Sequence, residues 1–169
     1  MFSVNDTVVY GTDGVCTVTD ITTRAFGKEK AEYYVLTPIH QNGACIYVPT
    51  ASEALLRKMR RVLSAEEIRQ LIADIPQESS HEWITDEAAR RTAFKTVLQS
   101  GDRRELVRMI KTIYLHGQEQ AKNGRKLHHS DEMMMKDAEK LLYDELAYVL
   151  GIRPDDILPL LISKSEPAV

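Results

Sequence analysis

The chain has 169 residues, of which 43% are hydrophobic and 28% are charged, and its formal net charge is -3 at pH 7. This composition allows one medium domain or two small ones, and it excludes a protein whose whole surface binds nucleic acid. The start lacks a basic, apolar leader, and no run approaches the roughly 18 apolar residues of a membrane span, so we expect a cytoplasmic protein without a membrane segment.

The first 63 residues have the pattern of a small β domain. Short runs of β-branched and aromatic residues, at 8–10, 15–21, 33–36 and 44–48, are separated by turn residues, and a further strand is expected at 60–63. Four or five strands in about sixty residues cannot form two full sheets, which predicts a small barrel of the SH3/Tudor kind. Cys16 and Cys45 lie in predicted strands and form no CxxC pair, so buried, reduced thiols are expected.

From Ser64 onward the apolar residues recur with the period of helices. Ser64 and Glu67 form a capping box, and the first helix is expected to end before Pro76 with Ile75 on its apolar face. Further starts are expected at Thr85 to Glu87, Asp102 and Ser130, with Gly101 and Gly151 as stops and a short tail helix at 154–162. The chain is therefore predicted to be α+β, with a β-barrel over residues 1–63 and an all-α helical bundle over residues 64–169.

Charge is unevenly distributed along the chain. Residues 83–127 contain ten Lys and Arg against five Asp and Glu, a local net charge of +5. Trp83, the single tryptophan, opens this basic stretch. A large aromatic side chain beside basic helices suggests contact with nucleic acid, whereas most tryptophans are largely buried and pack within or between domains. Both interpretations of Trp83 remain open from its position alone.

The sequence contains no recognisable catalytic motif. His81-Glu82 lacks the second histidine of HExxH, and neither a phosphate-binding glycine loop nor GxSxG occurs. His128-His129 has no third ligand nearby, and adjacent residues point apart. We therefore expect no enzymatic activity, no catalytic residues, no metal, no cofactor and no small-molecule substrate.

Several segments, taken in order, resemble the CarD/CdnL family of bacterial transcription regulators. They are Phe2 to Tyr10, Gly14-Val15, Tyr33 to Leu36, Ile46 to Pro49, the tryptophan before basic helices, Ser100 to Asp102, and Asp137 to Ala147. The resemblance implies an RNA polymerase-binding factor without enzymatic activity, present at the nucleoid through the polymerase. Its Tudor-like domain, similar to the RNA polymerase-interacting domain of transcription-repair coupling factor, binds the polymerase β subunit. Its helical domain contacts promoter DNA at the upstream edge of the bubble.

The resemblance also implies which residues face each partner. The polymerase-binding residues are Arg24 and the strand that adds to an edge of the β subunit, namely Ala44, Cys45, Ile46, Tyr47 and Val48. Tyr47 stands where some members carry arginine. The DNA-binding residues are Trp83, as a wedge in the minor groove, and the cations Arg90, Arg91, Lys95, Arg125 and Lys126. Between Trp83 and these cations the chain is about one helical turn longer than in some members.

A physical mechanism is consistent with this assignment. Basic side chains bind phosphate with weak sequence preference, whereas an apolar wedge acts where bases are already unstacked. A factor that binds the open promoter better than the closed one stabilises the open complex. The alternative is a protein-interaction or RNA-binding adaptor in which Trp83 is structural.

Overall fold

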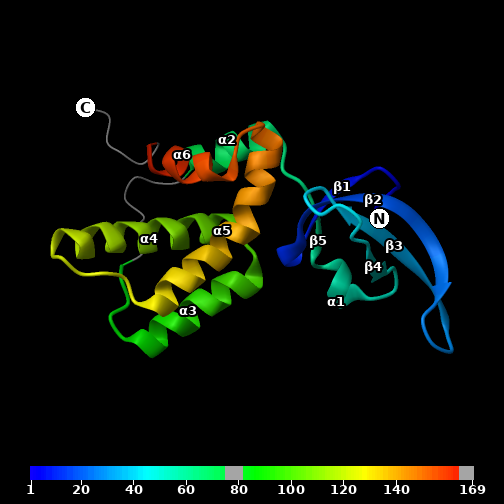
Figure 1. The fold of residues 1–169 in the computed structure, drawn as a ribbon, viewed down its shortest axis with the longest axis horizontal. Coiled ribbons are helices and arrows are strands. Elements are labelled where there is room, and N and C mark those ends of the chain that lie inside the picture. The colour runs from blue at the N-terminus through cyan, green and yellow to red at the C-terminus, as the bar shows by residue number, and fades with distance from the viewer. Residues whose placement is uncertain (75–81, 164–169) are drawn as a thin grey trace. The chain divides into compact units, whose positions relative to one another are not determined.

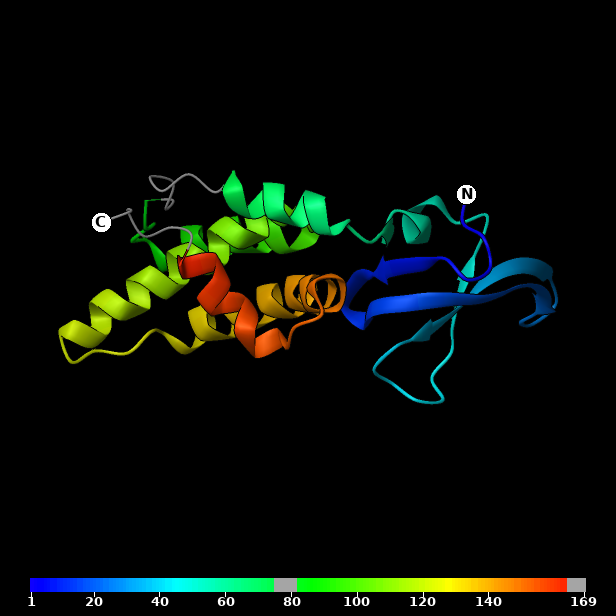
Figure 2. The same cartoon turned by 90° about the horizontal axis from the view of Figure 1, so that it is seen from above.

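The structure is a computed structural model that describes residues 1–74 and 82–163 (Figures 1 and 2). The chain divides into two compact units, Met1–Leu63 and Ser64–Val169. The first contains an antiparallel sheet and the second contains helices, so the chain is α+β as predicted.

The sheet of the first unit has five antiparallel strands in the order β4-β3-β2-β1-β5. Their bounds are β1 (Thr7–Tyr10), β2 (Gly14–Ala25), β3 (Lys30–Pro38), β4 (Ile46–Pro49) and β5 (Met59–Arg61). A short 3-10 turn, η1 (Gly11–Asp13), joins β1 to β2, and Gly14 then takes a φ of 78°, which glycine adopts without strain. All five expected strands are present. The sheet has β4 and β5 at its edges, and its closure into a barrel stays a prediction.

The hydrophobic core of this unit lies on one face of the sheet. Alternate residues of each strand reach it because side chains point to opposite faces along a strand. Its buried members are Val8, Cys16, Val18, Tyr34, Leu36, Val48 and Met59. Cys16 is buried as expected.

Two expectations for the first unit need correction, and one helix was not predicted. Ala44 and Cys45 precede β4 and are not part of a strand, and the Cys45 thiol is exposed. Strand β2 runs on to Ala25, so Arg24 lies within a strand. The sequence also gave no sign of α1 (Glu53–Leu56), a single turn whose N-cap Ser52 accepts a hydrogen bond from the Leu55 N–H at 3.4 Å. One turn is too short to show a helical period.

The second unit contains α2 (Ala65–Ala73), α3 (Glu87–Ser100), α4 (Arg103–Lys122), α5 (His129–Leu150), η2 (Pro154–Asp156) and α6 (Ile157–Ser163). The predicted start and stop signals at Ser64, Asp102 and Gly151 are confirmed. Ser64 and Glu67 form the reciprocal capping box, and Gly151 ends α5 with a φ of 67°. Ile75 and Pro76 lie outside the described residues.

The expected cap at Ser130 is wrong. Helix α5 begins at His129, and the carbonyl of His128 accepts hydrogen bonds from the N–H groups of Asp131 and Glu132 at 3.0 and 3.1 Å. Ser130 is therefore inside the helix. The side chain of Asp131, one residue later, turns into the protein and binds Arg90, a contact that local sequence does not reveal.

The core of the helical unit lies around α4 and α5, which contact each other and, in turn, α3 and α6 (Figure 1). Fully buried apolar residues occur at helical spacing on both central helices, at Leu106, Ile110 and Ile113 and at Ala138, Leu142 and Leu146. No helix in the described ranges is long and apolar enough to cross a membrane.

Candidate functional site

Strand β4, at an edge of the sheet, presents different side chains to its two faces. In the pairing of β3 with β4, Tyr34 lies opposite Val48 on the core side, and Val35 lies opposite Tyr47 one residue along. Because successive residues alternate in direction, Tyr33 and Tyr47 both point away from the core. The outer face of the sheet therefore carries aromatic side chains next to its β4 edge.

These side chains form a cluster that includes the turn after β2. The Phe26 ring centroid lies 5.1 Å from that of Tyr33 and 5.4 Å from that of Tyr47. The Arg24 guanidinium carbon lies 5.2 Å from the Tyr47 ring centroid. We call these four residues, Arg24, Phe26, Tyr33 and Tyr47, the outer aromatic cluster. Phe26 is 56% exposed, and exposed aromatic and arginine side chains are the residue types that dominate protein interfaces.

The structure places the residues predicted to bind polymerase in different environments. Arg24 and Tyr47, far apart in sequence, are brought together in the outer aromatic cluster. Ile46 and Val48 flank Tyr47 in β4, and Val48 is fully buried. Phe26 and Tyr33 were missed. The register of β3 against β4 places Tyr33 and Tyr47 on one face, and knowledge of this register could have identified Tyr33. The register depends on the loop before β4, so the strand sequences alone do not give it.

In the helical unit, Trp83 stacks on His116 of α4. Their ring centroids are 3.6 Å apart with an interplanar angle of 3°. Phe94 of α3 meets Trp83 edge-on at 6.2 Å, and the Arg90 guanidinium carbon lies over the indole at 4.6 Å. Trp83 nevertheless stays partly exposed, and it lines a pocket of about 370 Å³ together with Phe94, Val97 and Met109. It is therefore held by neighbours without being enclosed in the core.

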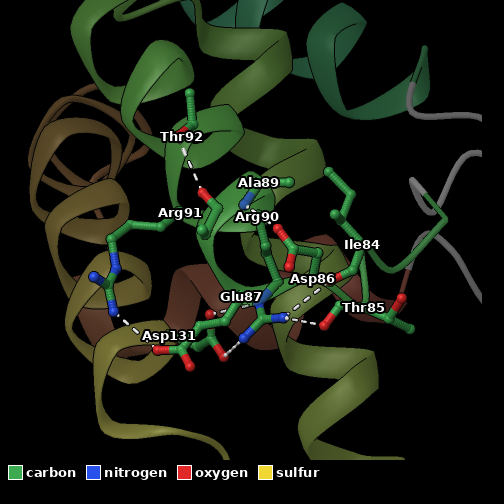
Figure 3. Close-up of polar contacts among 10 residues, drawn as sticks. Ile84, Thr85, Asp86, Glu87, Ala89, Arg90, Arg91, Thr92 and Asp131 are labelled. Carbon is green, nitrogen blue, oxygen red and sulfur yellow. Dashed lines mark hydrogen bonds and ion pairs between the residues drawn. The ribbon is translucent and has the colours of Figure 1, made fainter.

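Arg90 is buried, which corrects the expectation of a surface cation. Only 3% of its surface is exposed, and it makes a bidentate ion pair with Asp131, at 2.9 Å from Nε to Oδ1 and 3.0 Å from Nη2 to Oδ2 (Figure 3). Its Nη1 also donates to the carbonyl oxygens of Ile84 at 2.9 Å and Thr85 at 3.4 Å. A guanidinium with these partners is not available for phosphate.

Ion pairs also occupy other cations of the basic stretch. Arg91 pairs with Glu87, Arg103 with Glu145, Arg104 with Asp74, and Arg108 with Glu105. Lys111 is buried, and burial lowers the pKa of its amine. Within residues 1–74 and 82–163, four cations of the stretch are exposed and make no ion pair: Lys95, Lys122, Arg125 and Lys126. The local net charge of +5 thus overstates the number of cations that are available on the surface to bind a polyanion.

Helix order brings Trp83 and part of this charge to one end of the helical unit. The starts of α3 and α5 and the end of α4 lie at the same end in Figure 1. The loop after α4 carries Arg125 and Lys126, and the Arg125 N–H donates to the Gln120 carbonyl at 2.8 Å, which fixes the loop against α4. Exposed acids occur here too, at Glu82, Asp86 and Glu132. The end is therefore of mixed charge, with its cations on the loop after α4.

The imidazole of His116 lies beside Trp83, where burial favours its neutral form. Burial lowers the pKa of its imidazole. The negative charges of Glu119 and Asp131 oppose this shift, and the positive charges of Arg90 and His128 add to it. A neutral imidazole can stack on the indole with Arg90 nearby, because no second positive charge is then brought to the ring. Among the described residues, no three His, Cys, Asp or Glu side chains are grouped as metal ligands.

The chain thus consists of two units, one with an exposed aromatic cluster beside an edge strand and the other with a partly exposed tryptophan and exposed cations. Residues 2–63 match the family model of the CarD-like/TRCF RID domain. The N-terminal unit is therefore similar to this domain, which confirms the resemblance for that part of the chain. None of the curated proteins compared with the chain matches it.

Proposed function

We propose that the protein is a transcription regulator without enzymatic activity that binds the RNA polymerase β subunit and stabilises the promoter open complex. The match of residues 2–63 to the CarD-like/TRCF RID domain carries this proposal, because RID denotes an RNA polymerase-interacting domain. The regulator acts in the cytoplasm, at the nucleoid. The proposal includes closure of the five-stranded sheet into a Tudor-like barrel.

The polymerase contact is proposed at β4 and the outer aromatic cluster. An edge strand can pair with a strand of a partner through backbone N–H and C=O groups, and neighbouring side chains then select the partner. Here the selecting side chains are Arg24, Phe26 and Tyr47, since Arg24 and Phe26 each lie against the Tyr47 ring of β4. Because Arg24 already lies over an aromatic ring, it can meet a carboxylate of the partner with little loss of side-chain entropy.

We expect Arg24→Glu to weaken binding to the β subunit by about tenfold or more, since an interface arginine is commonly worth more than 1 kcal/mol. The guanidinium is exposed, so thermal stability should change by no more than about 0.5 kcal/mol. Titration of the full chain against the polymerase measures the affinity. Arg57→Glu, at another exposed arginine of the same unit, is the control and should bind normally. Equal affinity of the two variants would exclude this surface.

The DNA contact is proposed at the end of the helical unit that carries Trp83. Arg125 and Lys126 in the loop after α4, with Lys95 further along α3, supply exposed charge for phosphates, and phosphate contacts fix position without reading sequence. An apolar side chain is effective at the edge of the bubble because the bases there are already unstacked. Preferential binding to the open promoter by about 1.4 kcal/mol raises the ratio of open to closed complexes roughly tenfold.

The salt dependence of DNA binding tests which cations are used. Replacing Lys95, Arg125 and Lys126 by glutamine should lower affinity for DNA and reduce the slope of log affinity against log salt by up to about three, close to one per lost phosphate contact. The matched control replaces Arg104, Arg108 and Arg153, which are in ion pairs, and should keep most of the slope. If the slope falls equally in both triple variants, the change in salt dependence comes from the lower net charge and not from contacts at Lys95, Arg125 and Lys126.

One observation favours the adaptor alternative, namely the stacking of Trp83 on His116 inside the helical unit. A tryptophan used only for packing would have the same neighbours. The alternative predicts that the full chain does not retain RNA polymerase β subunit in a pull-down. Retention by the parent chain, and its loss in Arg24→Glu, would support the regulator.

A further inference from the structure

The indole of Trp83 has both faces covered. The His116 ring lies parallel to one face at 3.6 Å, which is van der Waals contact. The Arg90 guanidinium carbon is only 4.6 Å from the indole centroid, so it cannot lie on the face that His116 occupies without a clash and must cover the other face. A base therefore cannot stack on this tryptophan in the observed arrangement. Only the rim of the ring is free to meet a partner, and Phe94 takes part of that rim.

Arg90 is itself fixed by two other segments of the chain. Its two bonds to Asp131 connect it to the first turn of α5, and its bonds to the carbonyl oxygens of Ile84 and Thr85 connect it to the residues that follow Trp83 (Figure 3). The side chains of Arg90 and Asp131 are 3% and 4% exposed, so solvent does not compete for these bonds. The planar fork of arginine can make all of them at once, which a lysine ammonium cannot.

We infer that Arg90, Asp131 and His116 are positioning residues that hold Trp83 with its faces covered and its rim presented to the DNA. This inference rests on the proposed function for what the rim contacts, but the positioning itself is a property of the free protein. It also changes the role of Arg90, which the resemblance assigned to phosphate. Prior ordering of the indole means that less entropy is lost when it binds a partner.

Fluorescence offers a direct readout because Trp83 is the single tryptophan. In the full chain without DNA or polymerase, Arg90→Lys and Asp131→Asn should increase quenching by acrylamide and shift the emission maximum to the red. His116→Ala should do the same, whereas His116→Phe should preserve the stack. The control is Glu145→Gln, which disturbs a second buried ion pair, with Arg103, about 20 Å further along α5. It should lower thermal stability and leave quenching unchanged.

The lifetime of open complexes separates this inference from the proposed function. If the positioning variants increase quenching and also shorten the lifetime by roughly tenfold, a loss equivalent to about 1.4 kcal/mol, both ideas are supported. Greater quenching with an unchanged lifetime keeps the positioning role and rejects the DNA role of Trp83. Unchanged quenching in Arg90→Lys and Asp131→Asn overturns the positioning role, whatever the promoter shows.

A second variant covers the case in which a single substitution prevents folding. Arg90→Met combined with Asp131→Leu removes both charges and fills the space with apolar side chains, an exchange that buried ion pairs often tolerate. This double variant loses the bonds to Ile84 and Thr85, so the inference requires more quenching than in the parent chain at equal helical content. Parent-like quenching in the folded double variant would contradict it.

Discussion

Trp83→Ala is expected to shorten the lifetime of the promoter open complex at least tenfold while polymerase binding stays nearly intact. The indole rim is the proposed contact at the edge of the bubble, and about 1.4 kcal/mol lost there gives that factor. Stability should fall as well, because the ring stacks on His116 and Arg90. The loss should be about 2 kcal/mol, below the roughly 3–5 kcal/mol of core tryptophan truncations, since Trp83 is partly exposed and lies beside a pocket.

The measurement compares thermal unfolding with open-complex lifetime, and it needs a control of similar instability. Leu142→Ala serves, because Leu142 is fully buried in α5 and its truncation should cost about 2–5 kcal/mol without touching the surface. At a temperature where both variants are folded, only Trp83→Ala should shorten the lifetime. Equal lifetimes for the two variants would make Trp83 a packing residue and favour the adaptor alternative.

The second large effect is expected at the buried pair of Arg103 and Glu145. The two bonds measure 2.8 Å from Nε and 2.7 Å from Nη2, and the side chains are 18% and 1% exposed. This difference in exposure predicts that removing the arginine costs more free energy of unfolding than removing the charge of the glutamate. Arg103→Met removes both of these bonds from the deeply buried carboxylate and should cost about 3–5 kcal/mol. Glu145→Gln should cost less, because the partly exposed guanidinium can turn toward water.

Chemical denaturation of the two variants measures these costs. Arg69→Met is the control, because Arg69 and Glu66 pair on the surface with side chains 68% and 81% exposed. A pair of that kind contributes no more than about 1 kcal/mol. If Glu145→Gln proved more destabilising than Arg103→Met, the buried carboxylate would be stabilised mainly by other neighbours, and the pair would not explain its burial.

Elements controlled by nearby residues could be predicted from the sequence. The capping box at Ser64, the N-cap at Asp102 and the stop at Gly151 need only backbone groups within one turn, and each is where it was expected. Short runs of β-branched and aromatic residues between turn residues likewise predicted the five strands, because such side chains fit the pleated surface of a sheet. The family resemblance, carried by short motifs in order, is confirmed for residues 2–63.

Tertiary structure decided which side chains are available for function. Counting charge in residues 83–127 treated every cation alike, but Arg90 finds Asp131 41 positions away and Arg103 finds Glu145 42 positions away. Such partners depend on helix packing, so no local pattern reveals them. The same holds for Arg24, which lies over Tyr47 because of the strand register, and for the stack of Trp83 on His116. Local sequence determined the helices and strands. The packing of the helices decided which charged side chains are buried in a medium of low dielectric, where each needs a partner of opposite charge.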